Sequence, residues 1–126
     1  MNVKKREIEI YYNPSSGSDR RTIAYAQSLS PHIKIYSYDK LRFTSTKWCD
    51  IISKLDIEPK SLFNKALPEY QESIKGKEFD MEGWINVIQR NKHLLKAPIA
   101  MRGQSVVLCE SPTDVLRLSS SFKARS

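Results

Sequence analysis

Alternating polar and apolar residues mark the first regular element of the chain. Residues 7–12 read Glu-Ile-Glu-Ile-Tyr-Tyr, which is the period-two pattern of a half-buried strand. Asn13-Pro14 ends this strand, because proline lacks the N–H that a sheet ladder needs. Apolar residues then recur at helical spacing to about Leu29, and residues 32–38 form a second β-rich run. A strand, a helix and a strand with short connections predict a βαβ unit with parallel strands.

The middle of the chain changes to the helical period. Apolar residues follow the i, i+3, i+4, i+7 spacing after Thr44 and again after Asp80, and both residue types suit an N-cap. A shorter helix is expected at Pro59, because proline is favoured at the first helical position. Residues 69–78 are polar and are predicted to be irregular. About residues 40–93 therefore read as consecutive helices.

The β pattern returns near the C-terminus. Residues 98–101 and 105–109 are short β-rich runs, and the connection between them is short enough for an antiparallel hairpin. Ser111 and Pro112, with an acid at Asp114, then predict the start of a last helix. The chain thus ends in a ββα unit.

This order of elements predicts an α/β chain with a thioredoxin-like fold. A βαβ unit and a ββα unit would share one four-stranded mixed sheet flanked by helices. We expect one domain over residues 1–126, with its core at about 7–118. The helical insertion would occupy about residues 40–93, and residues 119–126 would form a frayed tail.

Composition and charge narrow the classes of function. No apolar run approaches the ~20 residues of a membrane span, and no signal-peptide core precedes the first strand, so we expect a cytoplasmic protein with no membrane contact. The net charge of +7 favours acidic partners. The basic residues are scattered, however, and no zinc-finger, KH or RNA-recognition signature accompanies them. Nucleic-acid binding is therefore only weakly supported.

The two cysteines, Cys49 and Cys109, lie far apart in the sequence. They form no CxxC pair, and no cluster of Cys and His has the spacing of a metal site. We therefore expect no metal, and we predict two free thiols that behave as small buried residues.

Four segments, taken in order, resemble the arsenate reductase (ArsC) family. The segment IYYNPSSGSDRRTIAYAQSL is similar to the family's opening, in which a strand ends in Asn-Pro shortly before a catalytic cysteine. The later segments are LDIEPKSLFNKALPEYQE, NKHLLKAPIAM and VVLCESPTDVLRL. The resemblance spans about residues 7–118 and implies the thioredoxin fold. The related regulator Spx shares this fold but opens with a CxxC that this chain lacks.

The resemblance places the family's nucleophilic cysteine on Ser16. The family's reaction needs a thiolate, whose pKa a helix N-terminus lowers. A serine hydroxyl offers no accessible anion and no thiol–disulfide chemistry. It would need a positioned base, and neither histidine is near it in sequence. We therefore expect no catalytic residue at this degenerate position.

The resemblance also implies three arginines that hold the oxyanion, and none of them is present. Their positions fall on Asn64, on Ala97, and on either Glu110 or Ser111. Lys65 and Lys96 are neighbours of two of these positions, but lysine does not reproduce the bidentate guanidinium fork.

The turn itself keeps features of an anion site, since helix N-termini expose amide donors and favour negative charge. The anion-binding or ligand-binding candidates are Ser15, Ser16, Gly17, Ser18, Arg20, Lys65, Lys96 and Pro98. The resemblance implies that Pro98 is a cis-proline close to Ser16. In the structural alternative, Ser16 or Ser18 simply caps the helix.

The leading hypothesis is an arsenate reductase-like protein that has lost its thiol chemistry and works as a binding or regulatory module. It would need no cofactor and would bind a protein partner or a small anion. One alternative is an active oxidoreductase that uses Cys109 or Cys49 with glutathione and glutaredoxin. A further alternative is a nucleic-acid-binding protein.

Overall fold

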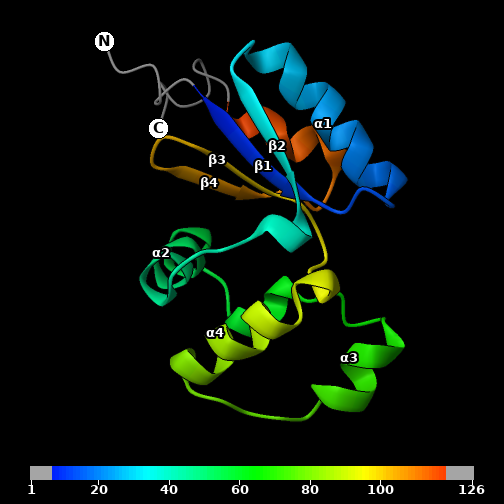
Figure 1. The fold of residues 1–126 in the computed structure, drawn as a ribbon, viewed down its shortest axis with the longest axis vertical. Helices are drawn as coiled ribbons and strands as arrows, with labels where there is room; N and C mark the ends of the chain where they lie inside the picture. The colour runs from blue at the N-terminus through cyan, green and yellow to red at the C-terminus, as the bar shows by residue number, and fades with distance from the viewer. Residues whose placement is uncertain (1–6, 119–126) are drawn as a thin grey trace. The chain divides into compact units, whose positions relative to one another are not determined.

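The computed structural model describes residues 7–118 and contains one four-stranded sheet. Its strands are β1 (Ile8–Tyr12), β2 (Ile33–Ser37), β3 (Ile99–Arg102) and β4 (Ser105–Leu108), in the order β2-β1-β3-β4 (Figure 1). β1 runs parallel to β2 and antiparallel to β3, and β3 and β4 form an antiparallel hairpin. The predicted four-stranded mixed sheet is confirmed. The predicted frayed tail lies outside the described residues.

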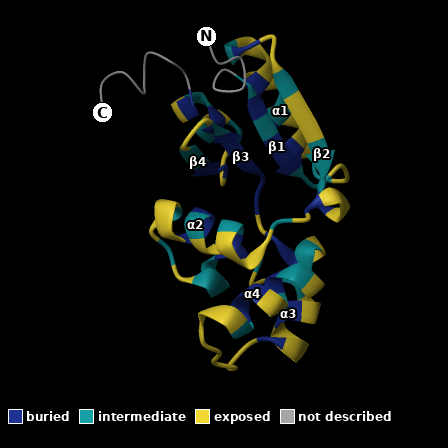
Figure 2. Ribbon diagram, turned by 60° about the vertical axis from the view of Figure 1, so that its left-hand side comes forward, coloured by how far each residue is buried: buried dark blue, intermediate teal, exposed yellow. Residues whose placement is uncertain are grey.

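One face of the sheet packs against helix α1 (Gly17–Leu29) and the 3₁₀ helix η5 (Pro112–Leu118). Ile8 and Ile10 alternate along β1 with more exposed residues and are both fully buried in this core. Ala26 of α1 and Val115 of η5 belong to the same cluster. Buried residues line β1 and β3 in Figure 2. The apolar faces of β1 and α1 therefore pack in one core, and the short turn between them joins the end of β1 to the start of α1.

The β3–β4 hairpin is tighter than the sequence suggested. Its turn contains two residues, Gly103 and Gln104, because Arg102 still pairs with Ser105 in the ladder. Gly103 has φ of 61°, a left-handed conformation that costs glycine little, so this position suits the turn.

A second compact unit, Leu41–Lys96, is helical, while the sheet unit takes the described residues up to Lys40 and from Ala97 onward. The helical unit contains α2 (Ser45–Leu55), η3 (Pro59–Leu62), α3 (Pro68–Ser73), α4 (Met81–Arg90) and η4 (Lys92–Leu94). Thr44 caps α2 through Lys47 N and Asp80 caps α4 through Gly83 N, as predicted. Trp48 and Trp84 are both buried, so their helical spacing does mark the core.

One expectation about helices is wrong. Residues 69–78 are not irregular throughout, because α3 occupies Pro68–Ser73. Pro68 stands at the start of α3, and Tyr70 and Ile74, four residues apart, are both buried, so a short polar helix is anchored on one side. The predicted last helix begins at Pro112 as expected, and Pro112–Leu118 is a 3₁₀ helix. Among residues 7–118, no helix is long and apolar enough to cross a membrane.

Candidate functional site

The turn between β1 and α1 is closed by its own backbone and by Asn13. The Ser16 amide donates to the Asn13 carbonyl at 3.0 Å. The Ser15 amide donates to Asn13 Oδ1 at 3.0 Å, which is a local side-chain turn. The sequence folds this way because Pro14 cannot continue the strand and Asn13 supplies acceptors for the two amides that follow.

Ser16 is the N-cap of α1, and both of its hydrogen-bonding functions are engaged. Its Oγ accepts from the Asp19 amide at 3.1 Å and donates to Asp19 Oδ1 at 3.1 Å. Its backbone is extended, with φ of −92° and ψ of 124°, as an N-cap requires. The capping alternative for Ser16 therefore describes its observed role, and its hydroxyl faces a carboxylate.

Asp19 places a buried carboxylate at this turn. Only 6% of the residue is exposed, and its Oδ2 accepts from the Asn13 amide at 2.9 Å. Burial raises the pKa of Asp19, and the hydrogen bonds from Asn13 and Ser16 oppose that shift. The Asp19 carboxylate thus accepts the hydrogen bonds of the Asn13 amide and the Ser16 hydroxyl, which an incoming anion would otherwise accept.

The other candidates in the turn do not converge on one point. Ser15 and Gly17 are exposed, and the Ser18 carbonyl accepts from Thr22 Oγ1 at 3.2 Å. Arg20 is exposed, and its Nη1 donates to the Pro14 carbonyl at 2.9 Å. The arginine therefore braces the turn backbone in this structure.

Behind the turn, Tyr38 links the end of β2 to the segment before β3. Its hydroxyl donates to the Ala97 carbonyl, and the residue is 5% exposed. Burial raises the pKa of Tyr38, and the nearby Asp19 carboxylate raises it further. Tyr38 is thus bonded to the peptide that precedes Pro98, and the Asp19 carboxylate lies near enough to influence it electrostatically.

Pro98 does not have the predicted cis bond, since no described residue has a cis peptide. The trans form of an X-Pro bond is favoured by ~0.5–1 kcal/mol, so a cis bond needs specific support from its surroundings. Here the Ala97 carbonyl is held by Tyr38, and the Pro98 carbonyl accepts from the Cys109 amide at 2.8 Å. Pro98 is buried, and its predicted closeness to Ser16 stays a prediction.

Cys109 lacks the environment of a reactive thiol. It is 2% exposed within the core of the sheet unit. Burial and the Asp114 carboxylate raise its pKa to about 12, although Arg117 opposes the shift. The thiolate is the nucleophilic form, so burial and the raised pKa both disfavour reaction of this thiol at neutral pH. Cys49 is exposed on α2, which contradicts its predicted burial.

At Asn64, where the resemblance implies one of the family's arginines, the side chain has a local partner, because Asn64 Oδ1 accepts from the Ala66 amide at 3.1 Å. The neighbouring Lys65 carbonyl accepts from Gln71 Nε2 at 3.1 Å. Lys65 and Lys96 are both exposed and belong to the helical unit, whereas the turn belongs to the sheet unit.

In the sheet unit, Ala97 is 3% exposed and has no room for a guanidinium without repacking. The Ser111 amide donates to Asp114 Oδ2 at 3.0 Å, and the Glu110 amide donates to the Leu108 carbonyl at 3.0 Å. No group of three or more potential metal ligands occurs among residues 7–118.

Asp19 and Tyr38 are not among the site residues predicted from the sequence. For Asp19 a signal was present, because Ser16-x-x-Asp19 has the spacing of a capping box before an apolar run. Tyr38 gave no comparable signal, since its partner is the carbonyl of a residue far along the chain.

Similarity to known proteins is found at the level of the fold and not of the sequence. The sequence matches no protein-family model and none of the curated proteins. Among solved structures, a candidate arsenate reductase from Yersinia pestis matches with a TM-score of 0.77 at 17% identity, over 88% of this chain and 99% of that one. The chain has the fold of the arsenate reductase (ArsC)-like proteins.

Two further structures agree. An arsenate reductase from Vibrio cholerae matches with a TM-score of 0.74 at 17% identity, covering 90% of this chain and 98% of that one. A candidate arsenate reductase from Streptococcus mutans matches with a TM-score of 0.69 at 18% identity, covering 81% and 88%. This chain therefore spans most of the length of each of these proteins.

Proposed function

We propose that this arsenate reductase-like protein has lost thiol reductase chemistry and acts as a binding module. The observation that carries the proposal is the hydrogen bonding of Ser16. The residue at the family's nucleophile position caps α1 and donates its hydroxyl proton to Asp19. A side chain held in this way has a structural role. Cys109 does not take its place, since it is buried with a raised pKa, and Cys49 lies on α2 in the helical unit rather than at the turn.

A protein partner fits the turn better than a small anion does. The Asn13 amide and the Ser16 hydroxyl already donate to the Asp19 carboxylate. An incoming oxyanion would meet that carboxylate at the helix N-terminus, and like charges at short distance repel strongly. Outside the turn, the net charge of +7 of the whole chain favours a partner with an acidic surface.

Arsenate reduction with glutathione and glutaredoxin tests the loss of activity. We expect no turnover above background for the natural protein, and little for Ser16→Cys. A thiol at position 16 gains the helix N-terminus but lies beside Asp19, whose carboxylate disfavours the thiolate. Ser16→Cys combined with Asp19→Asn removes that repulsion but still lacks the family's arginines. Loss of one oxyanion donor typically costs ~10²–10³ in rate.

Ser18→Cys is the matched control, because it adds a thiol to the same turn outside the family's position. An active arsenate reductase establishes the sensitivity of the assay. Robust turnover by the natural protein would contradict the proposal and favour the oxidoreductase alternative. In that event, Cys109→Ser and Cys49→Ser would show which thiol reacts.

A further inference from the structure

The helical unit contains a pocket of about 340 Å³ between α3, the segment that follows it, and α4. All of its lining residues belong to this one unit. We call it the α3–α4 pocket. None of its residues belongs to the turn around Ser16, so the pocket would be a second surface of the proposed binding module.

Positive charge distinguishes the α3–α4 pocket. Lys77 and Arg90 both line it, and its lining contains no acidic residue. Neither forms an ion pair within residues 7–118, whereas Lys54 and Lys60 in the same unit pair with Asp50 and with two glutamates. Asn86, an exposed residue of α4 with further amide donors, also lines it. The pocket is therefore complementary to a negatively charged acceptor.

Apolar side chains form the rest of the pocket. Ile74 is 4% exposed, whereas Phe79 leaves 39% of its surface in solvent. The Phe79 ring packs edge-on against Trp84, with ring centroids 4.9 Å apart. An exposed ring held in one orientation presents apolar area at little entropic cost on binding.

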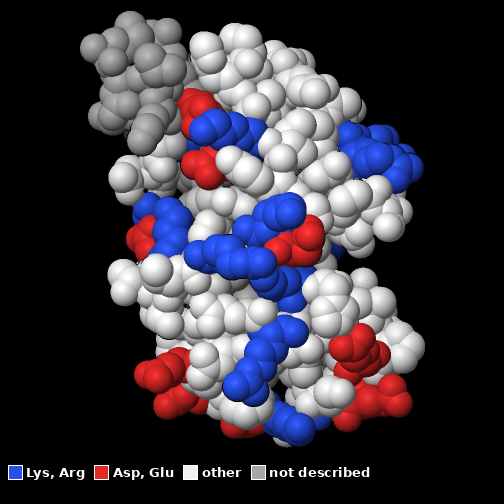
Figure 3. Space-filling model, in the orientation of Figure 1, with Lys and Arg blue, Asp and Glu red and all other residues white. Residues whose placement is uncertain are grey.

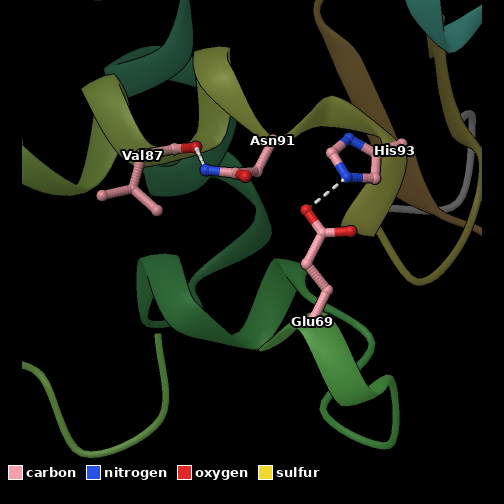
Figure 4. A network of polar contacts seen from close by, with 4 residues as sticks. All are labelled: Glu69, Val87, Asn91 and His93. Carbon is pink, nitrogen blue, oxygen red and sulfur yellow. Dashed lines mark hydrogen bonds and ion pairs between the residues drawn. The ribbon is translucent and has the colours of Figure 1, made fainter. Parts of the chain in front are cut away.

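The rim of the pocket is fixed by local hydrogen bonds, which Figure 4 shows. Asn91 Nδ2 donates to the Val87 carbonyl at 2.9 Å, so the end of α4 is closed by a pocket residue. Glu69, an acid of α3, lies 2.8 Å from His93 Nε2 and is engaged in that pair (Figure 4). The acid therefore already has a partner other than the two pocket cations.

A purely structural role accounts for part of this arrangement. Arg90 lies in the last turn of α4, where a cation is favoured by the helix dipole. That effect does not extend to Lys77, which lies outside both helices, or to the exposure of Phe79. The two cations can pair with an acidic side chain, and the exposed Phe79 ring can pack against an apolar side chain next to it.

We infer that the α3–α4 pocket binds a carboxylate side chain of a protein partner together with an adjacent apolar residue. This inference rests on the proposed binding function and names a partner chemistry for it. An acidic peptide uses both the cations and the apolar wall, whereas inorganic phosphate uses only the cations. The partner class is thus an acidic, partly apolar segment of another protein.

Nuclear magnetic resonance titration of the ¹⁵N-labelled protein tests the inference. The probe is the peptide acetyl-Leu-Asp-Phe-Glu-Leu-amide, and its neutral counterpart is acetyl-Leu-Asn-Phe-Gln-Leu-amide. We expect amide shift changes confined to residues 73–79 and 83–91. The neutral peptide, and Lys77→Gln combined with Arg90→Gln, should each weaken binding by about fivefold or more, since two exposed charge pairs are removed.

The matched control is Lys47→Gln with Lys54→Gln, which removes the same charge from α2 and should leave the titration unchanged. Equal binding of both peptides, undiminished binding by the pocket variant, or no localised shifts at about 10 mM peptide would overturn the inference. Phosphate that reproduced the peptide's shifts would also overturn it. The arsenate assay tests the proposed loss of activity separately, so the two failures are distinguishable.

Discussion

At the scale of single residues, Asp19 decides what the turn after β1 can do. Its carboxylate accepts from the Asn13 amide and from the Ser16 hydroxyl, and its own backbone amide donates to Ser16 Oγ. Such a carboxylate is held by hydrogen bonds and yet is nearly withdrawn from water. Burial disfavours its charged form, and this leads to a pH-dependent prediction.

The pKa of Asp19 is raised in the native state above its ordinary value. Between those two pKa values the native state binds more protons than the unfolded state, so the contribution of Asp19 to the free energy of unfolding declines as pH rises. We therefore subtract the free energy of unfolding of Asp19→Asn from that of the natural protein. We expect this difference to fall from about pH 3.5 upward and to level off above the raised pKa of Asp19.

Urea unfolding at a series of pH values measures this difference. Glu82→Gln, which removes an exposed carboxylate from the first turn of α4, is the control. A difference that grows with pH would contradict the prediction. It would mean that the Asn13 and Ser16 donors stabilise the ionised form more than burial penalises it.

At the scale of elements, α4 depends on a glycine that lies under an aromatic side chain. Phe79 precedes the N-cap Asp80, and Trp84 is the fourth helical residue, so their ring contact is a hydrophobic staple. A Cβ at Gly83 would lie 2.9 Å from Phe79 Cβ and 3.1 Å from Asp80 Oδ1. The staple and the cap therefore both require a residue without a side chain at this position.

Glycine to alanine inside a helix ordinarily stabilises it by about 1 kcal/mol. We expect Gly83→Ala instead to lower the free energy of unfolding by about 1–3 kcal/mol, because Phe79 and the cap must move. Gly17→Ala at the start of α1 is the control, since its new Cβ would meet only Arg20 Nη2, at 3.8 Å.

Urea denaturation measures both variants, and it also measures Gly83→Ala combined with Phe79→Gly. The double variant should lose less than the sum of its two single variants, because the Phe79 Cβ that the new methyl group would meet is removed. If Gly83→Ala alone stabilised the protein, the prediction would be wrong, because Phe79 and the cap would then move aside without loss of stability.

At the scale of the whole molecule, the basic residues that give the net charge of +7 are interspersed with acidic residues. Acidic side chains interrupt the basic ones on the face that Figure 3 shows. Affinity for nucleic acid comes from many phosphate contacts made together, so scattered cations give weak binding that salt removes.

We expect fluorescence anisotropy to detect at most weak binding to single-stranded RNA of about 20 nucleotides at 50 mM salt, and none at about 150 mM. The same RNA with a basic RNA-binding domain is the positive control. Tight binding that persists at the higher salt concentration would favour the nucleic-acid alternative over the binding function proposed here.

The sequence by itself determined most of the secondary structure and its order. The period-two pattern predicted β1, and helical spacing predicted α1, α2 and α4, because each pattern places apolar groups on one side of one element. The caps at Thr44 and Asp80 were predictable for the same reason, since each bonds an amide only three residues away. The parallel β1–β2 pairing and the antiparallel β3–β4 pairing followed from the lengths of their connections, whereas the β1–β3 pairing joins strands far apart in the chain and did not.

Only the tertiary structure decided what depends on distant neighbours. Cys49 and Cys109 look alike in sequence, yet one is exposed on a helix and the other is buried beside the sheet. The Ala97–Pro98 bond is trans, and its carbonyl is held by Tyr38, which is 59 residues away. The burial of Asp19, which raises its pKa, depends on how the sheet unit packs around the turn. Burial is a property of the folded unit. Local sequence therefore predicted that Ser16 could cap the helix, but it could not show that the carboxylate facing its hydroxyl is buried.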